Sequence, residues 1–473
     1  MKKLIVIICL INLITENISS QELIFKLNDP FSKKSSKKEV QFFSDQKNGN
    51  LMIFFKEDKM YKSLLLDSSF NKLGNIQKNS ISKGYKDIIG YDVREEDKFS
   101  LYFCDKKKSK FAVQIFDFSN KIHAEIDLDI NLRKELFVES ITFRNQFYLI
   151  TITKHSSVLN FYTLDKNYSI KKKTVSLKDF DYPNPQDKYH NITMYYLLVD
   201  DNSAFSNTNI NLEKINLKSI NSLETASKKN KLFQTDDKVI FTFNNNRFKT
   251  KLCTIDLIDF NTEVKTFDSP LAEEKNRFSN NSFVFEEKLF QASFSRDEIG
   301  ITISNIKSEQ LLKKYNVKKE DSIWFKNSQI IQKGTQFSNS KEKEIETTDA
   351  FLKKVALSNI GISVFKKNNL YNILLGGTDD IIYTSVGNHN LNLGGNTDFA
   401  RYAHSKMVYV TSTFNNSLEP VINDTQKNYY DKIIKFSDSL DTAEYESIFE
   451  HNDMIIYGYY STSNQIYNLL KFE

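Results

Sequence analysis

Residues 97–143 read DKFSLYFCDKKKSKFAVQIFDFSNKIHAEIDLDINLRKELFVESITF and contain three strand-like runs of one structural unit and the first run of the next. FSLYF and KFAVQIF are separated by the polar turn DKKKS, KIHAEID follows across FSN, and LFVESITF opens the next unit. Short runs rich in Phe, Tyr, Ile and Val between polar turns are typical of β-strands joined as hairpins. The stretch therefore predicts a four-stranded antiparallel sheet.

The same pattern recurs along the chain with a period of about 47 residues, which indicates a repeated supersecondary unit. The most apolar runs begin at Leu51, Phe99, Phe147, Lys238, Leu289, Gly361, Met407 and Met454, with a weaker one at Thr193. Four strands in a unit of this length are typical of a propeller blade. We therefore predict an all-β fold, a β-propeller of about seven or eight four-stranded antiparallel blades. The last hairpin, within 454–472, lacks an outer strand, which ELIFKL near the N-terminus would supply to close the ring.

Aspartates follow several strands in the same phase of the repeat, at Asp67, Asp117, Asp165, Asp259 and Asp438. A short carboxylate side chain accepts hydrogen bonds from backbone N–H groups two residues on, so these residues are interpreted as structural turn residues. A ring of catalytic carboxylates is the alternative, but such a ring does not need one member in every repeat.

Three segments break the period, at 178–192, 321–350 and 376–396, and we interpret them as insertions within a single domain, residues 22–473. Within the second, the charged run SKEKEIETTDAFLKK predicts a short helix capped by Thr347 or Thr348. Irregular loops on a rigid scaffold are where binding usually occurs. The candidate binding residues on these segments are Trp324, Gly376, Gly377, Asp379, Asp380, His389 and His404.

Sequence motifs for metal, phosphate and nucleophile chemistry are missing. The chain has no HExxH, no CxxC, no GxxxxGK[ST] and no GxSxG, and its 6 histidines are scattered. No metal, no cofactor and no catalytic residue is assigned. Because propeller active sites draw single residues from many blades, an enzyme stays open as an alternative.

The N-terminal residues 1–21, MKKLIVIICLINLITENISSQ, have the layout of a secretory signal peptide, with cleavage expected near Ser20 or Gln21. Export to the periplasm, the cell surface or the medium follows, with no transmembrane segment in the mature chain. Cys104 and Cys253 would then lie in an oxidising compartment. Both lie in strand-like runs of different units, so we interpret them as buried apolar thiols rather than as a disulfide.

The charge balance speaks against nucleic acid as a partner. The 65 Lys and Arg against 60 Asp and Glu leave a net charge of +5, and most of the cations are lysines. A dedicated nucleic-acid surface would use the forked guanidinium group of Arg. We expect a monomer.

The MKK-type signal, the Lys/Asn/Ile/Phe-rich composition and the strand–turn–strand–LD repeat resemble uncharacterised secreted β-propeller-like proteins of the Bacteroidota. The resemblance lies in composition and repeat pattern, extends over most of the chain and implies no catalytic residues. The leading hypothesis is an exported non-catalytic propeller that binds a protein or cell-envelope polymer through loops on one face. The alternative is a polysaccharide-active enzyme, a glycoside hydrolase or lyase, with acids drawn from several blades.

Overall fold

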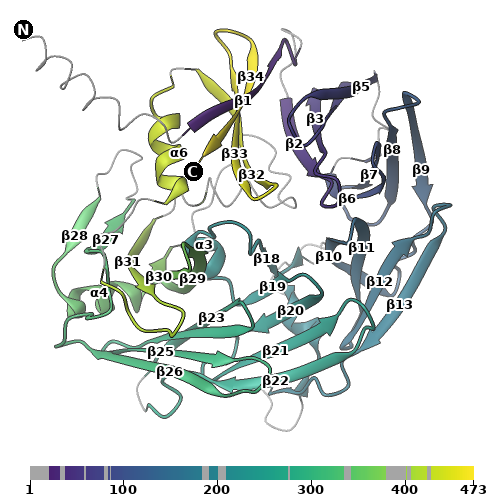
Figure 1. Cartoon of the computed structure of the whole chain (residues 1–473). Coiled ribbons are helices and arrows are strands. Elements are labelled where there is room, and N and C mark those ends of the chain that lie inside the picture. The colour runs from purple at the N-terminus through teal and green to yellow at the C-terminus, as the bar shows by residue number, and fades with distance from the viewer. Residues whose placement is uncertain are drawn as a thin grey trace, which may run out of the picture.

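Seven sheets of four or five strands are arranged in a ring as the blades of a propeller (Figure 1). The computed structural model describes residues 21–31, 38–57, 60–78, 84–85, 87–183, 191–200, 209–274, 277–334, 342–379, 401, 406–422, 428–440 and 442–472. The all-β propeller fold predicted from the repeat is therefore confirmed, with seven blades in the described part of the chain.

Four blades are regular, and their strands run from the centre to the rim in chain order. Blade 1 contains β2 (Lys38–Ser44), β3 (Leu51–Glu57), β4 (Met60–Leu66) and β5 (Lys72–Lys78). Blade 2 contains β6 (Asp87–Glu95), β7 (Lys98–Cys104), β8 (Phe111–Asp117) and β9 (Ile122–Leu128). Blade 3 contains β10 (Glu135–Phe143), β11 (Gln146–Thr153), β12 (Val158–Leu164) and β13 (Ile170–Ser176). Blade 5 contains β23 (Ser279–Phe285), β24 (Lys288–Phe294), β25 (Glu298–Asn305) and β26 (Leu311–Lys318).

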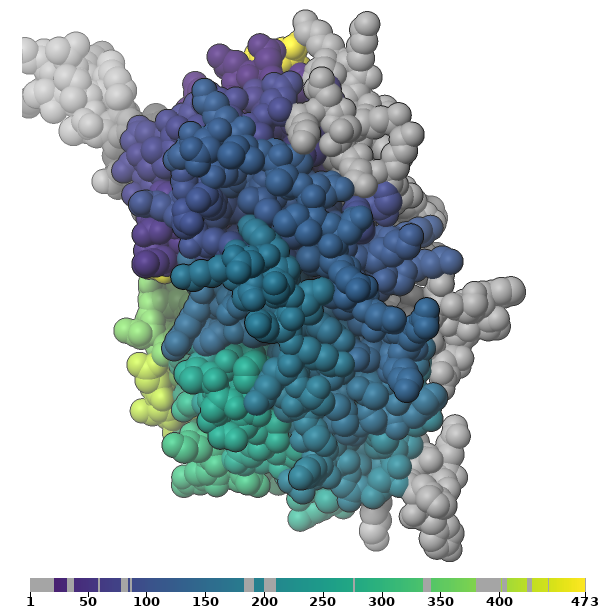
Figure 2. Space-filling view, turned by 90° about the vertical axis from the view of Figure 1, so that its right-hand side faces the viewer, coloured from purple at the N-terminus to yellow at the C-terminus, as the bar shows by residue number. Residues whose placement is uncertain are grey.

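The burial pattern explains why the middle strands are almost continuously apolar. In β3 every residue except Lys56 is buried, whereas the outermost strand β9 is mostly exposed. Neighbouring blades cover both faces of the middle strands, while the rim strands face water. Figure 2 views the ring from the side formed by blades 2 and 3, coloured blue to teal.

The ring closes as predicted. In blade 7, β32 (Ala443–His451), β33 (Met454–Ser461) and β34 (Ile466–Phe472) are followed at the rim by β1 (Gln21–Asn28). Strand β1 pairs antiparallel with β34 along its length, for example Asn28 with Ile466. The first strand of the domain therefore completes the last blade.

Blade 4 carries an extra strand at the centre of the ring. Its regular strands are β19 (Asn230–Gln234), β20 (Lys238–Phe243), β21 (Lys249–Asp256) and β22 (Thr262–Asp268). A short strand β18 (Glu213–Ile215) runs parallel to β19 on its inner side. Helix α3 (Leu223–Ala226) follows and also lies near the centre (Figure 1).

Blade 6 takes its outer strands from the segment that precedes it. Its strands from centre to rim are β29 (Asn359–Lys367), β30 (Leu370–Thr378), β31 (Met407–Phe414), β27 (Ile330–Lys333) and β28 (Lys343–Ile345). The interpretation of 321–350 as a loop insertion is wrong in this respect, because part of it supplies the fourth strand that this blade otherwise lacks. Helix α4 (Thr348–Val355) follows, and the Thr347 side chain caps it by accepting from Ala350 N, so the predicted helix is confirmed.

Two expectations about the repeat are wrong. The run at Thr193 is no strand, because α2 (Met194–Leu198) begins there and buries its apolar side chains against blades 3 and 4. The runs at Gly361 and Met407 are not two units, because β29 and β31 lie in the same blade. The small ladders β14 (Tyr182–Pro183) with β15 (Asn191–Ile192), and β16 (Val199–Asp200) with β17 (Asn209–Ile210), belong to the connection between blades 3 and 4.

Strand direction determines which connections share a face of the ring. Successive strands of an antiparallel blade alternate in direction. The connection from the second to the third strand and the connection from one blade to the next therefore emerge on the same face, which we call the long-connection face. Residues 177–229 and the segment between β30 and β31 both begin and end there.

The two cysteines of the described residues lie in the strand-built core. Cys104 and Cys253 are free and buried, and burial raises the pKa of the Cys104 thiol to about 12. The interpretation as buried apolar thiols is confirmed. Among the helices in the described ranges, none has the length and apolar character needed to cross a membrane.

Candidate binding site

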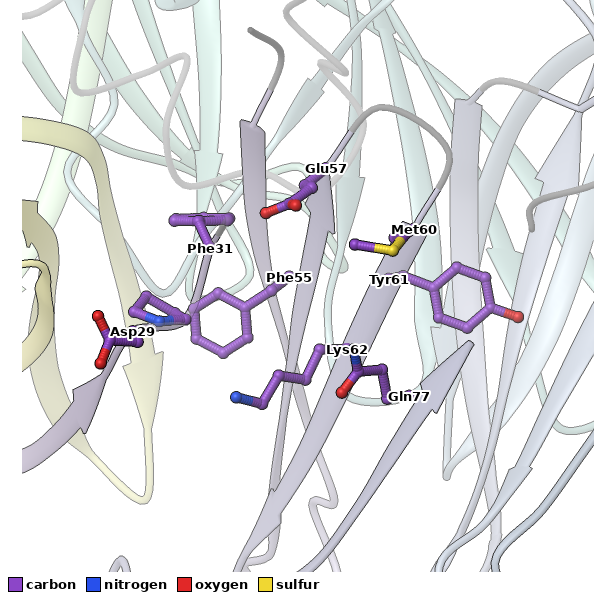
Figure 3. Close-up of a pocket in the computed structure, with 9 residues that line it drawn as sticks. Asp29, Phe31, Phe55, Glu57, Met60, Tyr61, Lys62 and Gln77 are labelled. Atoms are coloured by element: carbon purple, nitrogen blue, oxygen red, sulfur yellow. The ribbon is translucent and has the colours of Figure 1, made fainter. Parts of the chain in front are cut away.

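A pocket of about 230 Å³ opens on the long-connection face where blade 7 meets blade 1 (Figure 3). Its residues come from the segment after β1, from the end of β3, the start of β4 and the end of β5, which are all strand ends of this face. The lining residues are Asp29, Pro30, Phe31, Phe55, Glu57, Met60, Tyr61, Lys62 and Gln77.

Aromatic rings form one wall of the pocket. Phe31 and Phe55 meet edge to face with their centroids 5.6 Å apart, and Phe31 meets Tyr460 of blade 7 in the same way at 5.3 Å. Phe31 is only 6% exposed. The rings therefore join the connecting segment to both blades, and the wall is rigid because packed rings of this kind hold a defined geometry.

The ammonium group of Lys38 packs against the aromatic rings of this wall. The Lys38 ammonium lies 5.3 Å from the centroid of Phe31, 5.9 Å from that of Tyr445 and 5.4 Å from that of Tyr460. Attraction between an ammonium and a ring face is worth roughly 0.5–2 kcal/mol, depending on desolvation. Lys38 begins the innermost strand of blade 1, so this cage fastens the two blades at the site of ring closure.

The polar groups of the pocket carry both signs of charge. Asp29 and Glu57 contribute carboxylates, Lys62 an ammonium and Gln77 an amide. Figure 3 shows the Lys62 side chain beside Gln77 below Phe55, whereas the Tyr61 ring points away from the other labelled side chains. Burial lowers the pKa of Lys62, the charge of Lys72 lowers it further, and Asp29 opposes both.

The centre of the ring is occupied by the chain itself. We call residues 213–227, which include β18 and α3, the plug. Its backbone accepts hydrogen bonds from Asn281 of blade 5 at Ser227 O (2.7 Å) and from Ser363 of blade 6 at Asn221 O (2.8 Å). Ile220 packs in a cluster with side chains of blade 7. The plug therefore connects several blades across the channel.

Charged side chains around the plug are paired or bonded to backbone oxygens. Arg401 Nη1 lies 2.6 Å from Glu213 Oε1, and its Nε lies 3.7 Å from Glu224 Oε1. Lys231 is fully buried and donates to Lys228 O and Asn281 Oδ1. Burial lowers the pKa of Lys231 well below its ordinary value and that of Lys229 to about 8. Arg401 therefore pairs with two carboxylates of the plug, and Lys231 is bonded to oxygens of residues next to it.

Trp324, a predicted binding residue, lies half exposed on the segment between blades 5 and 6. Its ring meets Tyr315 at 5.7 Å and Phe325 at 5.5 Å, both near edge-to-face. One side of the indole is therefore packed, and the other is open, with 51% of the residue exposed.

The two glycines Gly376 and Gly377 do not lie in a loop, and this part of the predicted insertion 376–396 is wrong. Both lie in β30, where a Cβ on Gly376 would come within 2.0 Å of Val408 O and one on Gly377 within 2.7 Å of Ser358 Cβ. They are glycines because neighbouring chain segments approach too closely for a side chain.

The remaining predicted binding residues are only partly described. Asp379 forms an ion pair with Lys406 at 2.9 Å, and its backbone N–H donates to Lys406 O, so it joins the two ends of the segment between β30 and β31. Asp380, His389 and His404 lie outside the described residues, as does the predicted signal peptide up to Ser20. Residues 184–190 of the predicted insertion 178–192 also lie outside them.

Four of the five turn aspartates accept backbone hydrogen bonds at the end of a third strand. Asp67 accepts from Ser69 N and Asn71 N, Asp117 from Asn120 N, Asp165 from Asn167 N and Ser169 N, and Asp259 from Asn261 N. Hydrogen bonds from Asn71 lower the pKa of Asp67. Asp438 differs from these four, because it caps the C-terminus of α6 (Tyr429–Ser437). The prediction of a strand directly before Asp438 is therefore wrong.

Within the ranges that the structure describes, no three His, Cys, Asp or Glu side chains come together in a way that could hold a metal ion. Sequence reasoning missed the pocket, because its residues come from two chain segments that only ring closure brings together. The local signals were the Asp-Pro-Phe turn directly after the closing strand and the run FFKEDKMYK, which mixes aromatic residues with charges of both signs.

Comparison with known proteins finds no matching family model and no matching curated protein. Among solved structures, the Dos1 propeller is 8% identical, with 95% of each chain covered and a TM-score of 0.34. An oligogalacturonate lyase in complex with manganese is 8% identical, with 93% of this chain and 97% of that chain covered and a TM-score of 0.33. The SapL1 lectin in complex with alpha methyl fucoside is 8% identical, with 73% and 90% covered and a TM-score of 0.24. Similarities this weak carry no functional argument, so the propeller assignment rests on the strand pairing of this chain.

Proposed function

We propose that this chain is an exported, non-catalytic β-propeller that binds a protein or cell-envelope component through its long-connection face. The observation that carries the proposal is the pocket between blades 7 and 1, which combines aromatic walls with a few polar groups. Concave sites of this composition are the usual places of ligand recognition. The secretory pattern of residues 1–21 supports export.

The test is crosslinked capture of native envelope material by the tagged full chain. The pocket variant combines Lys62→Ala with Gln77→Ala, and the matched control combines Lys314→Ala with Lys318→Ala, which are exposed on the rim strand β26. We expect the pocket variant to lose at least about tenfold of the captured component, as for one or two lost polar contacts, and the control to lose none. Equal capture by a pocket variant that unfolds at the wild-type temperature would contradict the proposal.

A third arm tests the predicted contribution of blade 6. Trp324→Ala removes an exposed indole without touching a strand. Deletion of 321–350 is unsuitable, because β27 and β28 would be lost with it. Reduced capture by Trp324→Ala with unchanged capture by the pocket variant would move the binding surface to blade 6.

A second candidate function, a polysaccharide-active enzyme, is favoured by Glu450 at the opposite end of the channel. Burial raises the pKa of this carboxyl, Asp453 raises it further, and Lys218 of the plug lowers it. Its Oε2 is buried without a hydrogen-bond partner in the structure. A carboxyl whose pKa is raised by burial and by a second carboxyl is typical of a general acid.

Release of reducing ends from envelope polysaccharides tests this candidate. Turnover by the wild-type chain that Glu450→Gln abolishes would support the enzyme. Turnover that Glu450→Gln leaves unchanged, or none at all, would count against it.

A further inference from the structure

We propose that the pocket between blades 7 and 1 binds an uncharged, hydroxyl-rich ring, the terminal sugar residue of a glycan. This inference rests on the proposed binding function and names its ligand class.

Charges of both signs line the pocket, which favours a neutral ligand. Asp29 and Glu57 are acceptors, Lys62 is a donor, and Gln77 is both. An anionic ligand would face two carboxylates, and a cationic ligand would face Lys62 with the Lys38 ammonium behind the Phe31 wall. A ring with several hydroxyl groups offers donors to the carboxylates and acceptors to Lys62 and Gln77 at once, without burying an uncompensated charge.

The size of the pocket limits the ligand to about one ring. Its volume of about 230 Å³ is below the range of roughly 300–1,000 Å³ that is typical of sites for drug-sized ligands. The pocket also opens to solvent on one side, so the rest of a longer glycan can extend into solvent. A terminal residue therefore fits better than an internal segment.

The pocket lining also contains the apolar side chains Phe31, Phe55 and Met60, which can contact C–H groups of a sugar ring. Phe31 and Phe55 lie next to each other, and Met60 lies apart from them beyond Glu57 (Figure 3). Because Lys38, Tyr445 and Tyr460 hold Phe31 in place, the wall is formed before a ligand arrives. Preorganisation of this kind reduces the entropy lost on binding.

Titration of the full chain with simple sugars tests the inference. The probes are methyl glucopyranoside and methyl galactopyranoside as neutral rings, glucosamine as the cationic ring and glucuronate as the anionic ring, with binding followed by calorimetry. We expect saturable binding of at least one neutral ring, with both charged rings weaker by at least about tenfold, since each buries an unpaired charge.

Two single substitutions in the pocket lining test whether a sugar binds there. Asp29→Asn keeps the positive φ of 46° that this position requires, because Asn tolerates the left-handed region, and removes only the charge. Gln77→Ala removes an exposed amide. Each is expected to weaken neutral-ring binding about tenfold through one lost polar contact. The control Lys314→Ala on β26 is expected to bind as the wild type does.

The outcomes separate this inference from the proposed function. Loss of envelope capture by the pocket variant, without binding of any neutral sugar, would overturn the inference and leave the proposed function standing. Binding of a neutral sugar that Asp29→Asn and Gln77→Ala weaken, with unchanged envelope capture, would support the inference and overturn the proposed function. Tighter binding of glucosamine or glucuronate, or neutral binding that neither variant changes, would overturn the inference.

Discussion

His451 is a buried titratable side chain where the innermost strands of blades 7 and 1 meet. It is 2% exposed, its Nδ1 lies 2.9 Å from Ser44 Oγ, and its Nε2 lies 3.2 Å from Asn452 Nδ2. Burial lowers its pKa, and a hydrogen bond involving the Gly49 backbone only partly opposes this. The neutral imidazole is therefore the form that the folded state favours.

The sign of the pH effect follows from this lowered pKa. In the unfolded chain the imidazole takes up a proton near its ordinary pKa of about 6.5, whereas in the folded protein it does so only at lower pH. The contribution of His451 to stability is complete above the unfolded pKa and is lost as the pH falls towards the folded pKa.

We therefore predict that wild-type stability falls between about pH 7.5 and pH 5 and that His451→Gln makes this fall smaller. Urea denaturation at several pH values measures it. The control is His155→Gln, because His155 is exposed on a turn of blade 3, and its pH profile should match the wild type. A profile of His451→Gln that is as steep as the wild type would refute the assignment.

At the scale of a strand, β30 shows which of two reasons for a glycine applies at Gly376. Glycine excess marks either a turn or a close approach of chain segments. Gly376 sits where the β31 backbone would lie within 2.0 Å of a Cβ, so close approach is the reason here.

Gly376→Ala is predicted to destabilise blade 6 by about 1–3 kcal/mol or more, because a backbone carbonyl must move to make room. Gly84→Ala is the matched control, since nothing lies within 4 Å of its added Cβ. Thermal unfolding of both variants checks this. Unchanged stability of Gly376→Ala would contradict the packing role and reopen a role in binding.

At the scale of the whole molecule, the plug joins blades that are distant in sequence. Asn281 of blade 5 is fully buried and donates to Ser227 O of the plug and to Ile360 O of blade 6, at 2.7 and 2.8 Å. It also accepts from the buried Lys231 of blade 4. One side chain therefore satisfies polar groups from three parts of the ring.

Asn281→Leu is predicted to lower the free energy of unfolding by at least about 3 kcal/mol, because several buried polar groups lose their partner at about 1–3 kcal/mol each. Asn316→Leu on the exposed rim of blade 5 is the control and should change it by less than about 0.5 kcal/mol. Urea denaturation measures both variants. A small effect at Asn281 would mean that the plug contributes little to the stability of the ring.

The sequence by itself determined the features that depend on local pattern. The strand repeat, a cap at Thr347 or Thr348 and the buried thiols follow from residue type and spacing over a few positions. The missing outer strand of the last hairpin indicated that residues 22–27 close the ring. Strand periodicity and helix capping are local effects, so a single chain segment contains the information for them.

Only the tertiary structure decided the features that depend on which segments meet. Strands β27 and β28 are the outer strands of blade 6 although they precede its inner strand in the chain. The plug contacts blades 5, 6 and 7 at the centre of the ring, and Asp29 and Phe31 line one pocket with Glu57 and Lys62 at the closure. Each arises from packing between residues far apart in the chain, whose partners no local pattern specifies. The pocket is the clearest case, because it exists only when the first strand has paired with the last.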